Sequence, residues 1–507
     1  MTGKSISAKI AIHPAFALGS IDDRLFGSFV EHLGRSVYGG VYERGHPRAD
    51  AEGFRDDVAD LIVDLGPTLV RYPGGNFVSG YRWEDGVGPR SSRPVRPDLA
   101  WRTVEPNEFG TGEFMRWCRK VGVEPMMAVN LGTRGIEDAS RLLEYCNLGG
   151  GTELSELRRE HGAPDPYGVK LWCLGNEMDG PWQIGRKTAA EYGRLAAETA
   201  NAMRMVDPSI ELVACGSSYR AIETYGEWER QVLELCYERV DYLSLHTYYS
   251  NAANNGGEFL ARSDEMDAFI KEVVAICDAV KAHRRSPKTL KLSFDEWNVW
   301  FHTLEDDKKV TPWQRAPRLL EDVYTAEDAT LVGGMLITLL NNADRVKIAC
   351  LAQLVNVIAP IMTETGGRAW RQTIFHPFAL TAAAAKGGTT LRQAVESDRY
   401  DAGTAKDAPY LASACVRTKT GGLAVFAVNR SQDKDLELSI EYPHLEGLGS
   451  PRWKTLRHDD PKATNTADRP NEVVPVDGGK VEVRGDVARL ALPARSWNII
   501  EFRGTGA

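Results

Sequence analysis

The stretch VKLWCLGNE at residues 169–177 decides the fold, because a continuous apolar run ends there in a glycine and two polar residues. A strand that is buried on both faces gives such a run, rather than a strict alternation of apolar and polar residues. Eight runs of this kind lie between residues 21 and about 387, each followed by a loop rich in Gly, Pro or Asn. The other seven are LFGSFVEH (25–32), TLVRYPGG (68–75), EPMMAVNLG (124–132), IELVACGSS (210–218), DYLSLHTYY (241–249), LKLSFDEWN (290–298) and IACLAQLVN (348–356).

Segments with apolar residues at helical spacing lie between these runs. They are predicted at 54–66, 188–206, 225–240, 265–283 and 376–387. Repeated alternation of strand and helix predicts an α/β fold, a (β/α)8 TIM barrel with insertions. A doubly wound open sheet shares the alternation. It would more often show a Gly-rich phosphate loop after its first strand, and LFGSFVEHLGR is not one.

The pattern changes at about residue 390 to short alternating segments separated by turn signals such as Gly421-Gly422. This pattern predicts an antiparallel β-sandwich of jelly-roll-like form. The segment SAKIAIHP at 7–14 alternates in the same way, so we expect it to pair with the C-terminal strands. The predicted domains are a catalytic barrel over 15–388 and a β-sandwich over 389–507, joined by an N-terminal strand at 5–14.

Composition narrows the classes of ligand and location. The 507 residues carry 61 Lys and Arg against 70 Asp and Glu, a net charge of −9, with no long basic run. Such a chain is poorly suited to binding nucleic acid or an anionic membrane. The eight cysteines are scattered without a C-x-x-C pair, which favours a reduced cytoplasmic protein. His13 and Pro14 interrupt the only candidate signal sequence, and no apolar stretch is long enough to span a bilayer.

Polar side chains end seven of the eight runs, and the carboxyl ends of the strands are where a (β/α)8 barrel carries its active site. The sequence shows no nucleophile elbow, H-E-x-x-H motif or phosphate loop. The polar residues are Glu31, Arg71, Asn76, Asn130, Asn176, Glu177, His246, Tyr248, Glu296, Asn298 and Gln353.

Two carboxylates stand out in this set, Glu177 after the fourth run and Glu296 in the seventh. Strand ends on opposite sides of a barrel mouth can place two carboxyl groups on either side of one glycosidic bond. Retaining glycosidases need about 5–5.5 Å between them, one group protonating the leaving oxygen and the other attacking the anomeric carbon. Tyr248 is a candidate donor to the nucleophile, and Asn176 a candidate partner for a sugar hydroxyl.

Each of these residues also has a structural interpretation. Glu177 could serve the first turn of a helix, His246 could be a hydrogen-bonded core residue, and Gln353 could satisfy a loop backbone. Arg71 could simply pair with a carboxylate inside the barrel. The tryptophans could be core or loop anchors instead of sugar platforms: Trp83, Trp101, Trp182, Trp300 and Trp313. The joint placement of polar groups on one rim favours a catalytic site.

The motifs FGSFVEHLGR, LVRYPGGNF, WCLGNEMDG, LSLHTYY and FDEWNVW resemble, in this order, those of family 51 α-L-arabinofuranosidases among the glycoside hydrolases. The likeness covers nearly the whole chain and implies hydrolysis by double displacement with net retention. It implies that Glu177 is the acid/base and Glu296 the nucleophile. The residues that the resemblance places in the sugar pocket are Glu31, Asn76, Asn176, Tyr248 and Gln353. The supporting residues around the pocket are Arg71, Asn130 and His246. The residues on the leaving-group side are Trp101, Trp182 and Trp300.

The resemblance implies an exo-acting enzyme that removes terminal α-L-arabinofuranosyl residues from arabino- and arabinoxylo-oligosaccharides. It also implies that no metal or other cofactor is needed, that the enzyme is cytoplasmic and that it forms a hexamer. One alternative is another retaining barrel glycosidase, an endoglucanase or β-xylosidase. An open groove lined by tryptophans would favour endo action. A second alternative is a non-catalytic carbohydrate-binding protein, which the presence of both carboxylates disfavours.

Overall fold

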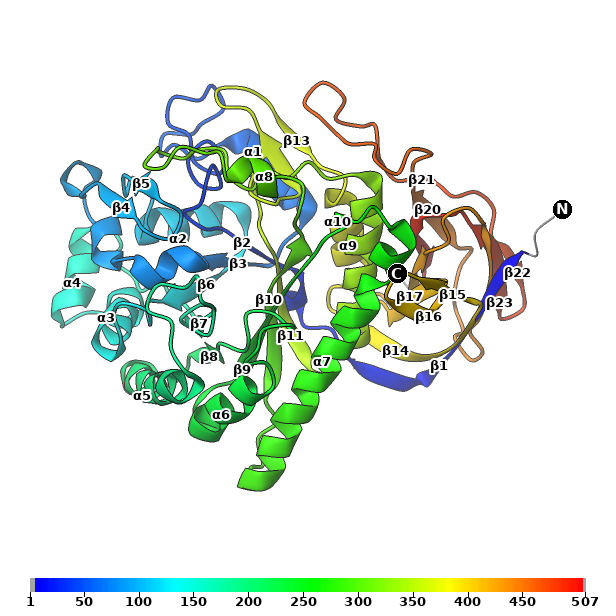
Figure 1. The fold of residues 1–507 in the computed structure, drawn as a ribbon, viewed down its shortest axis with the longest axis horizontal. Coiled ribbons are helices and arrows are strands. Elements are labelled where there is room, and N and C mark those ends of the chain that lie inside the picture. Colours follow the sequence, from blue (N-terminus) through cyan, green and yellow to red (C-terminus); the bar gives the residue numbers. More distant parts are fainter. Residues whose placement is uncertain (1–4, 505–507) are drawn as a thin grey trace.

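The eight apolar runs form a closed barrel in the computed structural model, which describes residues 5–504 (Figure 1). The strands follow one another around the barrel in chain order, each parallel to the next, and the last closes on the first. The predicted fold class is confirmed. The barrel strands are β2 (Gly27–Phe29), β3 (Leu69–Tyr72), β6 (Glu124–Val129), β7 (Leu171–Leu174), β8 (Glu211–Ala214), β9 (Tyr242–Tyr249), β10 (Lys291–Val299) and β11 (Val346–Leu351).

Helices surround the barrel, and all five predicted segments contain one. The first, α1 (Asp56–Leu65), buries Val58, Ile62 and Leu65 and ends at Gly66, whose φ of 75° is left-handed and suits glycine. The segment predicted at 265–283 belongs to a longer helix, α7 (Gly256–Arg284), in which the Asn255 side chain caps the N-terminus. The other helices are α2 (Thr111–Val121), α3 (Ile136–Asn147), α4 (Glu153–Glu160), α5 (Ala189–Val206), α6 (Glu227–Cys236), α8 (Leu304–Asp307), α9 (Ala326–Asn341) and α10 (Phe375–Ala385).

A second, ten-stranded sheet forms the C-terminal part of the chain and lies beside α9 (Figure 1). The N-terminal strand β1 (Ile6–Ser20) belongs to it, antiparallel to β14 and parallel to β19, and its pairing with β14 continues as far as Ser20. The remaining strands are β14 (Thr389–Ser397), β17 (Leu411–Arg417), β18 (Leu423–Asn429), β19 (Leu436–Glu441), β20 (Arg452–Leu456), β21 (Val476–Asp477), β22 (Glu482–Arg484), β23 (Val487–Leu492) and β24 (Ser496–Phe502).

Alternate residues of the central strand β18 enter two different cores. Ala424, Phe426 and Val428 join the core of the barrel, whereas Leu423 and Val425 join a second core inside the C-terminal sheet. Both faces of β18 are therefore buried, and the apolar contact with the barrel fixes the sheet against it.

Short hairpins lie in the loops, and the hairpin formed by β4 and β5 carries Trp101 at its turn. No helix among the described residues is long and apolar enough to cross a membrane. The hairpin strands are β4 (Arg96–Asp98) with β5 (Thr103–Glu105), β12 (Ile361–Thr363) with β13 (Ala369–Arg371), and β15 (Arg399–Ala402) with β16 (Ala405–Pro409).

Candidate active site

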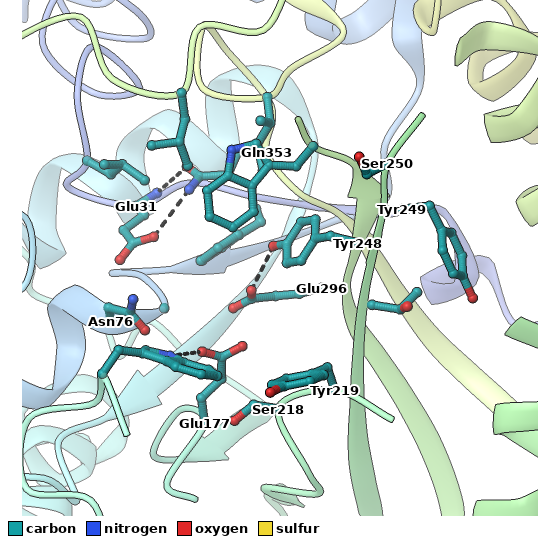
Figure 2. A pocket seen from close by; sticks show the side chains of 18 of the residues that line it. Glu31, Asn76, Glu177, Ser218, Tyr219, Tyr248, Tyr249, Ser250, Glu296 and Gln353 are labelled. Carbon is teal, nitrogen blue, oxygen red and sulfur yellow. Dashed lines mark hydrogen bonds between the residues drawn. The ribbon is translucent and has the colours of Figure 1, made fainter. Parts of the chain in front are cut away.

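A cavity of about 730 Å³ opens at the carboxyl ends of the barrel strands (Figure 2). Its volume falls in the range of small-molecule sites, about 300–1,000 Å³. The predicted site residues among those that line it are Glu31, Asn76, Trp101, Glu177, Trp182, Tyr248, Glu296, Trp300 and Gln353.

The two glutamates face each other across this cavity. One oxygen of Glu177 and one of Glu296 lie within 4.8 Å of each other and of a ring nitrogen of His246. This closeness matches the carboxyl separation of about 5–5.5 Å in retaining glycosidases and is well short of the ~6.5–9.5 Å of inverting ones. The pair therefore has the spacing for attack by one carboxylate on the sugar itself.

Both oxygens of Glu296 accept hydrogen bonds. Arg71 Nη1 donates to Oε1 at 2.7 Å, and the Tyr248 hydroxyl donates to Oε2 at 2.8 Å, as Figure 2 shows for the tyrosine. The register of β10 against β9 shifts between Ser293 and Glu296, an irregularity that can re-aim side chains near an active site. The two donors fix the orientation of this carboxylate toward the cavity, as an attacking group requires.

Glu177 lies in a loop after β7, and its φ of 43° is left-handed, which is unusual for a residue with a side chain. The next helix does not begin until Ala189, so Glu177 serves no helix terminus. Burial raises the pKa of Glu177 and the Glu296 carboxylate raises it further, while hydrogen bonds from His246 and Trp182 oppose the rise. A raised pKa keeps a carboxyl group protonated nearer neutral pH, as a general acid requires.

His246 connects the two glutamates to a third buried carboxylate. Its Nδ1 lies 2.9 Å from Glu177 Oε1, and its Nε2 lies 3.3 Å from Asp295 Oδ1. Burial alone would lower the pKa of His246, but Glu296, Asp295 and Glu177 together raise it to about 10. The imidazole is therefore a cation at neutral pH, which donates a hydrogen bond from Nδ1 to Glu177 and forms an ion pair with Asp295 through Nε2.

A His246→Asn substitution is expected to move the alkaline limb of the kcat/KM profile to higher pH. The imidazolium lowers the pKa of Glu177, so its removal lets that pKa rise, and the acid stays protonated to higher pH. The pH profile of both enzymes on an arabino-oligosaccharide, whose leaving oxygen needs the proton of Glu177, checks this from acid to alkaline buffers. An unchanged limb, or one at lower pH, would mean that His246 does not control the proton on Glu177.

Arg71 is the cation at the centre of the site, and its side chain is only 1% exposed. It contacts Glu296, donates from Nη2 to Asn176 Oδ1 at 2.6 Å and has its Nε 3.7 Å from Asp295 Oδ2. It also lies over the Phe29 ring.

An Arg71→Met substitution is expected to lower the free energy of unfolding by about 3–5 kcal/mol, because it removes the guanidinium paired with two buried carboxylates, Glu296 and Asp295, and leaves only the His246 imidazolium beside them. Urea unfolding at neutral pH measures this. The matched control is Arg48→Met, which breaks an ion pair with Asp60 whose side chains are 59% and 76% exposed and should cost less than about 1 kcal/mol. Equal losses in the two variants would contradict a buried, charge-balancing role for Arg71.

Glu31 is held at the other side of the pocket. Its Oε1 accepts from the Phe77 amide and from Trp101 Nε1, both at 2.9 Å, and its Oε2 accepts from Gln353 Nε2 at 3.2 Å. Burial raises the pKa of Glu31 to about 8. A Cβ on Gly74, whose φ is 152°, would lie 2.4 Å from Glu31 Cγ, so only glycine allows this close approach.

The remaining predicted residues divide between the pocket and its surroundings. Asn176 joins Arg71 to Asn76, and Trp300 packs edge-on against Tyr248 with ring centroids 5.5 Å apart. Asn130 does not line the cavity; its amide organises the loop after β6 through Gly132, Thr133 and Tyr81.

Sequence reasoning missed Asp295, Tyr219 and Tyr249. Asp295 precedes Glu296 in a strand, where alternation would send the two side chains to opposite faces, and only the irregular pairing of β10 lets both approach Arg71. The tyrosines line the cavity. The signal for Tyr249 was its position at the end of the sixth run.

The atoms of Glu177, His246 and Glu296 are also of the types that ligate metals. Each is already engaged, however: Glu177 with His246 and Trp182, and Glu296 with Arg71 and Tyr248. A metal ion would have to displace these bonds. Metal-free chemistry stays the prediction.

A (β/α)8 barrel with two glutamates so close at its catalytic end defines a retaining glycoside hydrolase. Two family models match the chain, described as alpha-L-arabinofuranosidase 1 domain over residues 61–270 and alpha-L-arabinofuranosidase C-terminal domain over residues 295–496. The chain belongs to the α-L-arabinofuranosidases of glycoside hydrolase family 51.

Two relatives match over nearly their full lengths. An intracellular exo-α-(1→5)-L-arabinofuranosidase of Halalkalibacterium halodurans is 54% identical, over 98% of this chain and 99% of that one. An exo-α-(1→6)-L-arabinofuranosidase of Bifidobacterium longum is 50% identical, over 99% and 98%. The solved structure of a family 51 α-L-arabinofuranosidase from Bifidobacterium longum superposes with a TM-score of 0.93 at 44% identity, covering 99% of this chain and all of the other.

Proposed function

We propose that this protein is a retaining, exo-acting α-L-arabinofuranosidase that uses Glu296 as nucleophile and Glu177 as acid/base. The observation that carries the proposal is the pair of carboxylates within 4.8 Å, one hydrogen-bonded by Arg71 and Tyr248 and the other with a raised pKa. The substrates proposed are arabino- and arabinoxylo-oligosaccharides with a terminal arabinofuranosyl residue.

The reaction proceeds in two displacements. Glu296 attacks the anomeric carbon while the bond to the leaving oxygen breaks and Glu177 gives that oxygen its proton. The covalent arabinosyl ester then accepts attack by water, whose proton passes to Glu177 as Glu296 leaves. Two inversions at one carbon give retention, and Glu177 returns to its protonated state.

The pocket itself supports exo action. Trp101 and Gln353 both donate to Glu31 and, with it, line the side of the pocket away from Glu177, and Trp300 packs on Tyr248. A terminal sugar fits such a closed end, whereas an internal sugar needs the chain to continue past it. The relatives' printed linkages differ, α-(1→5) in one and α-(1→6) in another, so the proposal concerns the sugar and not the linkage.

Location and assembly complete the proposal. Relatives named as intracellular support a cytoplasmic enzyme that acts on short oligosaccharides. A homohexamer is proposed from the family resemblance, and light scattering in solution should return six times the chain mass of 56.0 kDa.

Initial rates on p-nitrophenyl α-L-arabinofuranoside, β-D-xylopyranoside and β-D-glucopyranoside test the function. We expect kcat/KM for the arabinofuranoside to exceed the others by about 100-fold or more, because buried polar groups that lose their hydroxyl partners penalise the wrong sugar. EDTA should leave the rate unchanged. Preference for a pyranoside would retain the two-glutamate chemistry but overturn the substrate. Binding without turnover of any aryl glycoside would favour the carbohydrate-binding alternative.

A further inference from the structure

The cavity is larger than one five-membered sugar ring requires. Its 730 Å³ continue past Glu177 to residues that contact neither Glu296 nor Glu31, contributed by the loop after β8, the end of β9 and α7. Since Glu177 is the proposed proton donor to the leaving oxygen, this extension lies on the leaving-group side. The residues of the extension are Ser218, Tyr219, Arg220, Ala221, Tyr249, Arg262, Glu265 and Phe269.

Two aromatic rings lead from Glu177 into the extension. Trp182 Nε1 donates to Glu177 Oε2 at 2.7 Å, so the indole begins at the catalytic carboxyl group. The Tyr219 ring follows, with its centroid 6.0 Å from that of Trp182 and its plane inclined by 27°. Trp182 and Tyr219 are 45% and 41% exposed, so both leave apolar surface that a ligand can cover. Figure 2 shows Tyr219 on the cavity side of Glu177.

Two buried carboxylates anchor the loop that carries Tyr219. The buried Asp179 accepts from the backbone amide of Ser218 at 3.2 Å and from its hydroxyl, and Glu229 accepts from the amide of Ser217 at 2.7 Å. Anchoring by two buried carboxylates fixes the backbone directly before Tyr219, so the point from which its side chain projects is set before any ligand arrives.

The far side of the extension is polar, and its arginines are paired with carboxylates. Arg262 pairs with Glu258 at 3.0 Å and with Glu265, and Arg220 pairs with Glu272 through two nitrogens. Each guanidinium is paired with at least one carboxylate of α7, so the surface offers hydrogen bonds but no unpaired cation to bind an acidic group. An apolar ring beside paired polar groups suits a neutral sugar.

We propose that Tyr219 forms a distal leaving-group subsite, which binds the second sugar beyond the scissile bond while the first lies over Trp182. The inference rests on the proposed function and deepens it: the preferred substrates are oligosaccharides of at least three sugars, in which the third sugar contacts Tyr219.

The test compares kcat/KM for α-1,5-arabinotriose with that for α-1,5-arabinobiose. The wild-type ratio is expected to favour the trisaccharide by about 5–10-fold, the worth of one aromatic stacking contact, and in Tyr219→Ala the ratio should fall close to one, mainly through KM. Taking the ratio removes any effect that Tyr219 transmits through Trp182 to both substrates alike.

Two further variants separate stacking from other effects. Tyr219→Phe keeps the ring and should keep the wild-type ratio. Phe16→Ala removes an aromatic side chain that is 60% exposed on β1, outside the cavity, and should also keep it. A wild-type ratio near one, or an unchanged ratio in Tyr219→Ala, would overturn the distal subsite alone. If the wild-type enzyme cleaves none of the three substrates, neither the two oligosaccharides nor the aryl arabinofuranoside, the proposed function is overturned as well.

Discussion

Replacement of Glu296 by alanine is expected to lower kcat on p-nitrophenyl α-L-arabinofuranoside by roughly 10⁴-fold or more. The loss is this large because both displacements need the Glu296 carboxylate, first as attacking group and then as leaving group. A reactive aryl leaving group cannot restore the rate, since no covalent ester can form at all. Initial rates measure the effect, on variant protein that has been purified free of wild-type enzyme and assayed long enough to detect a very low rate.

Azide identifies what the lost carboxylate did. In Glu296→Ala the vacated space lies beside the anomeric carbon, where a small anion can replace the carboxylate in a single displacement. We expect azide to restore turnover and to give the inverted β-arabinosyl azide. The α-azide from this variant would show instead that Glu296 serves as acid/base, and the assignments of Glu177 and Glu296 would then be exchanged.

A structural control accompanies this variant, because Arg71 loses its principal partner when Glu296 is removed. Glu296→Gln keeps the side-chain shape and the acceptor oxygen for Arg71 while removing the nucleophilic charge. It should be as inactive as Glu296→Ala and should unfold at a urea concentration close to that of wild type. Recovery of activity in the glutamine variant would mean that Glu296 acts by shape and not as a nucleophile.

The barrel could be predicted from the sequence because its strands are buried on both faces and leave continuous apolar runs such as LWCL in β7. The same burial hid α9. Its residues from Ala326 to Leu340 are all buried between the barrel and the C-terminal sheet, so no polar face marks a helical period. Gly333 there lies against Trp497 of β24, a close packing that no local pattern records.

The site was predictable to the extent that strand ends converge. Glu177, Glu296 and Tyr248 were expected to meet because the barrel brings the ends of β7, β9 and β10 to one mouth, and they line one cavity. What could not be read from the sequence depends on local departures from regular geometry. The irregular pairing of β10 adds Asp295 to the charge network, and the left-handed φ of Glu177 turns its side chain out of the strand's regular course.

Replacement of Glu177 by alanine is expected to divide substrates by the quality of their leaving group. A p-nitrophenolate departs without a proton, so the first displacement should remain fast, whereas an oligosaccharide leaving group should react about 10²–10⁴-fold more slowly. The second displacement loses its base, so the arabinosyl ester on Glu296 should accumulate. A burst of nitrophenol equal to the enzyme concentration, followed by a slow steady state, measures both effects.

Azide again distinguishes the role, now with the opposite stereochemistry. It needs no base to attack, so it should accelerate the slow second step of Glu177→Ala and give the retained α-arabinosyl azide. The raised pKa of Glu177 adds a further expectation: the alkaline limb that its deprotonation imposes on the wild-type kcat/KM for an oligosaccharide should be absent from the variant. The matched control is Glu177→Gln, which keeps the acceptor for His246 but carries no transferable proton and should show the same burst. A variant without a burst, with equal losses on aryl and oligosaccharide substrates and no response to azide, would place Glu177 outside proton transfer and leave its contact with His246 as a structural one.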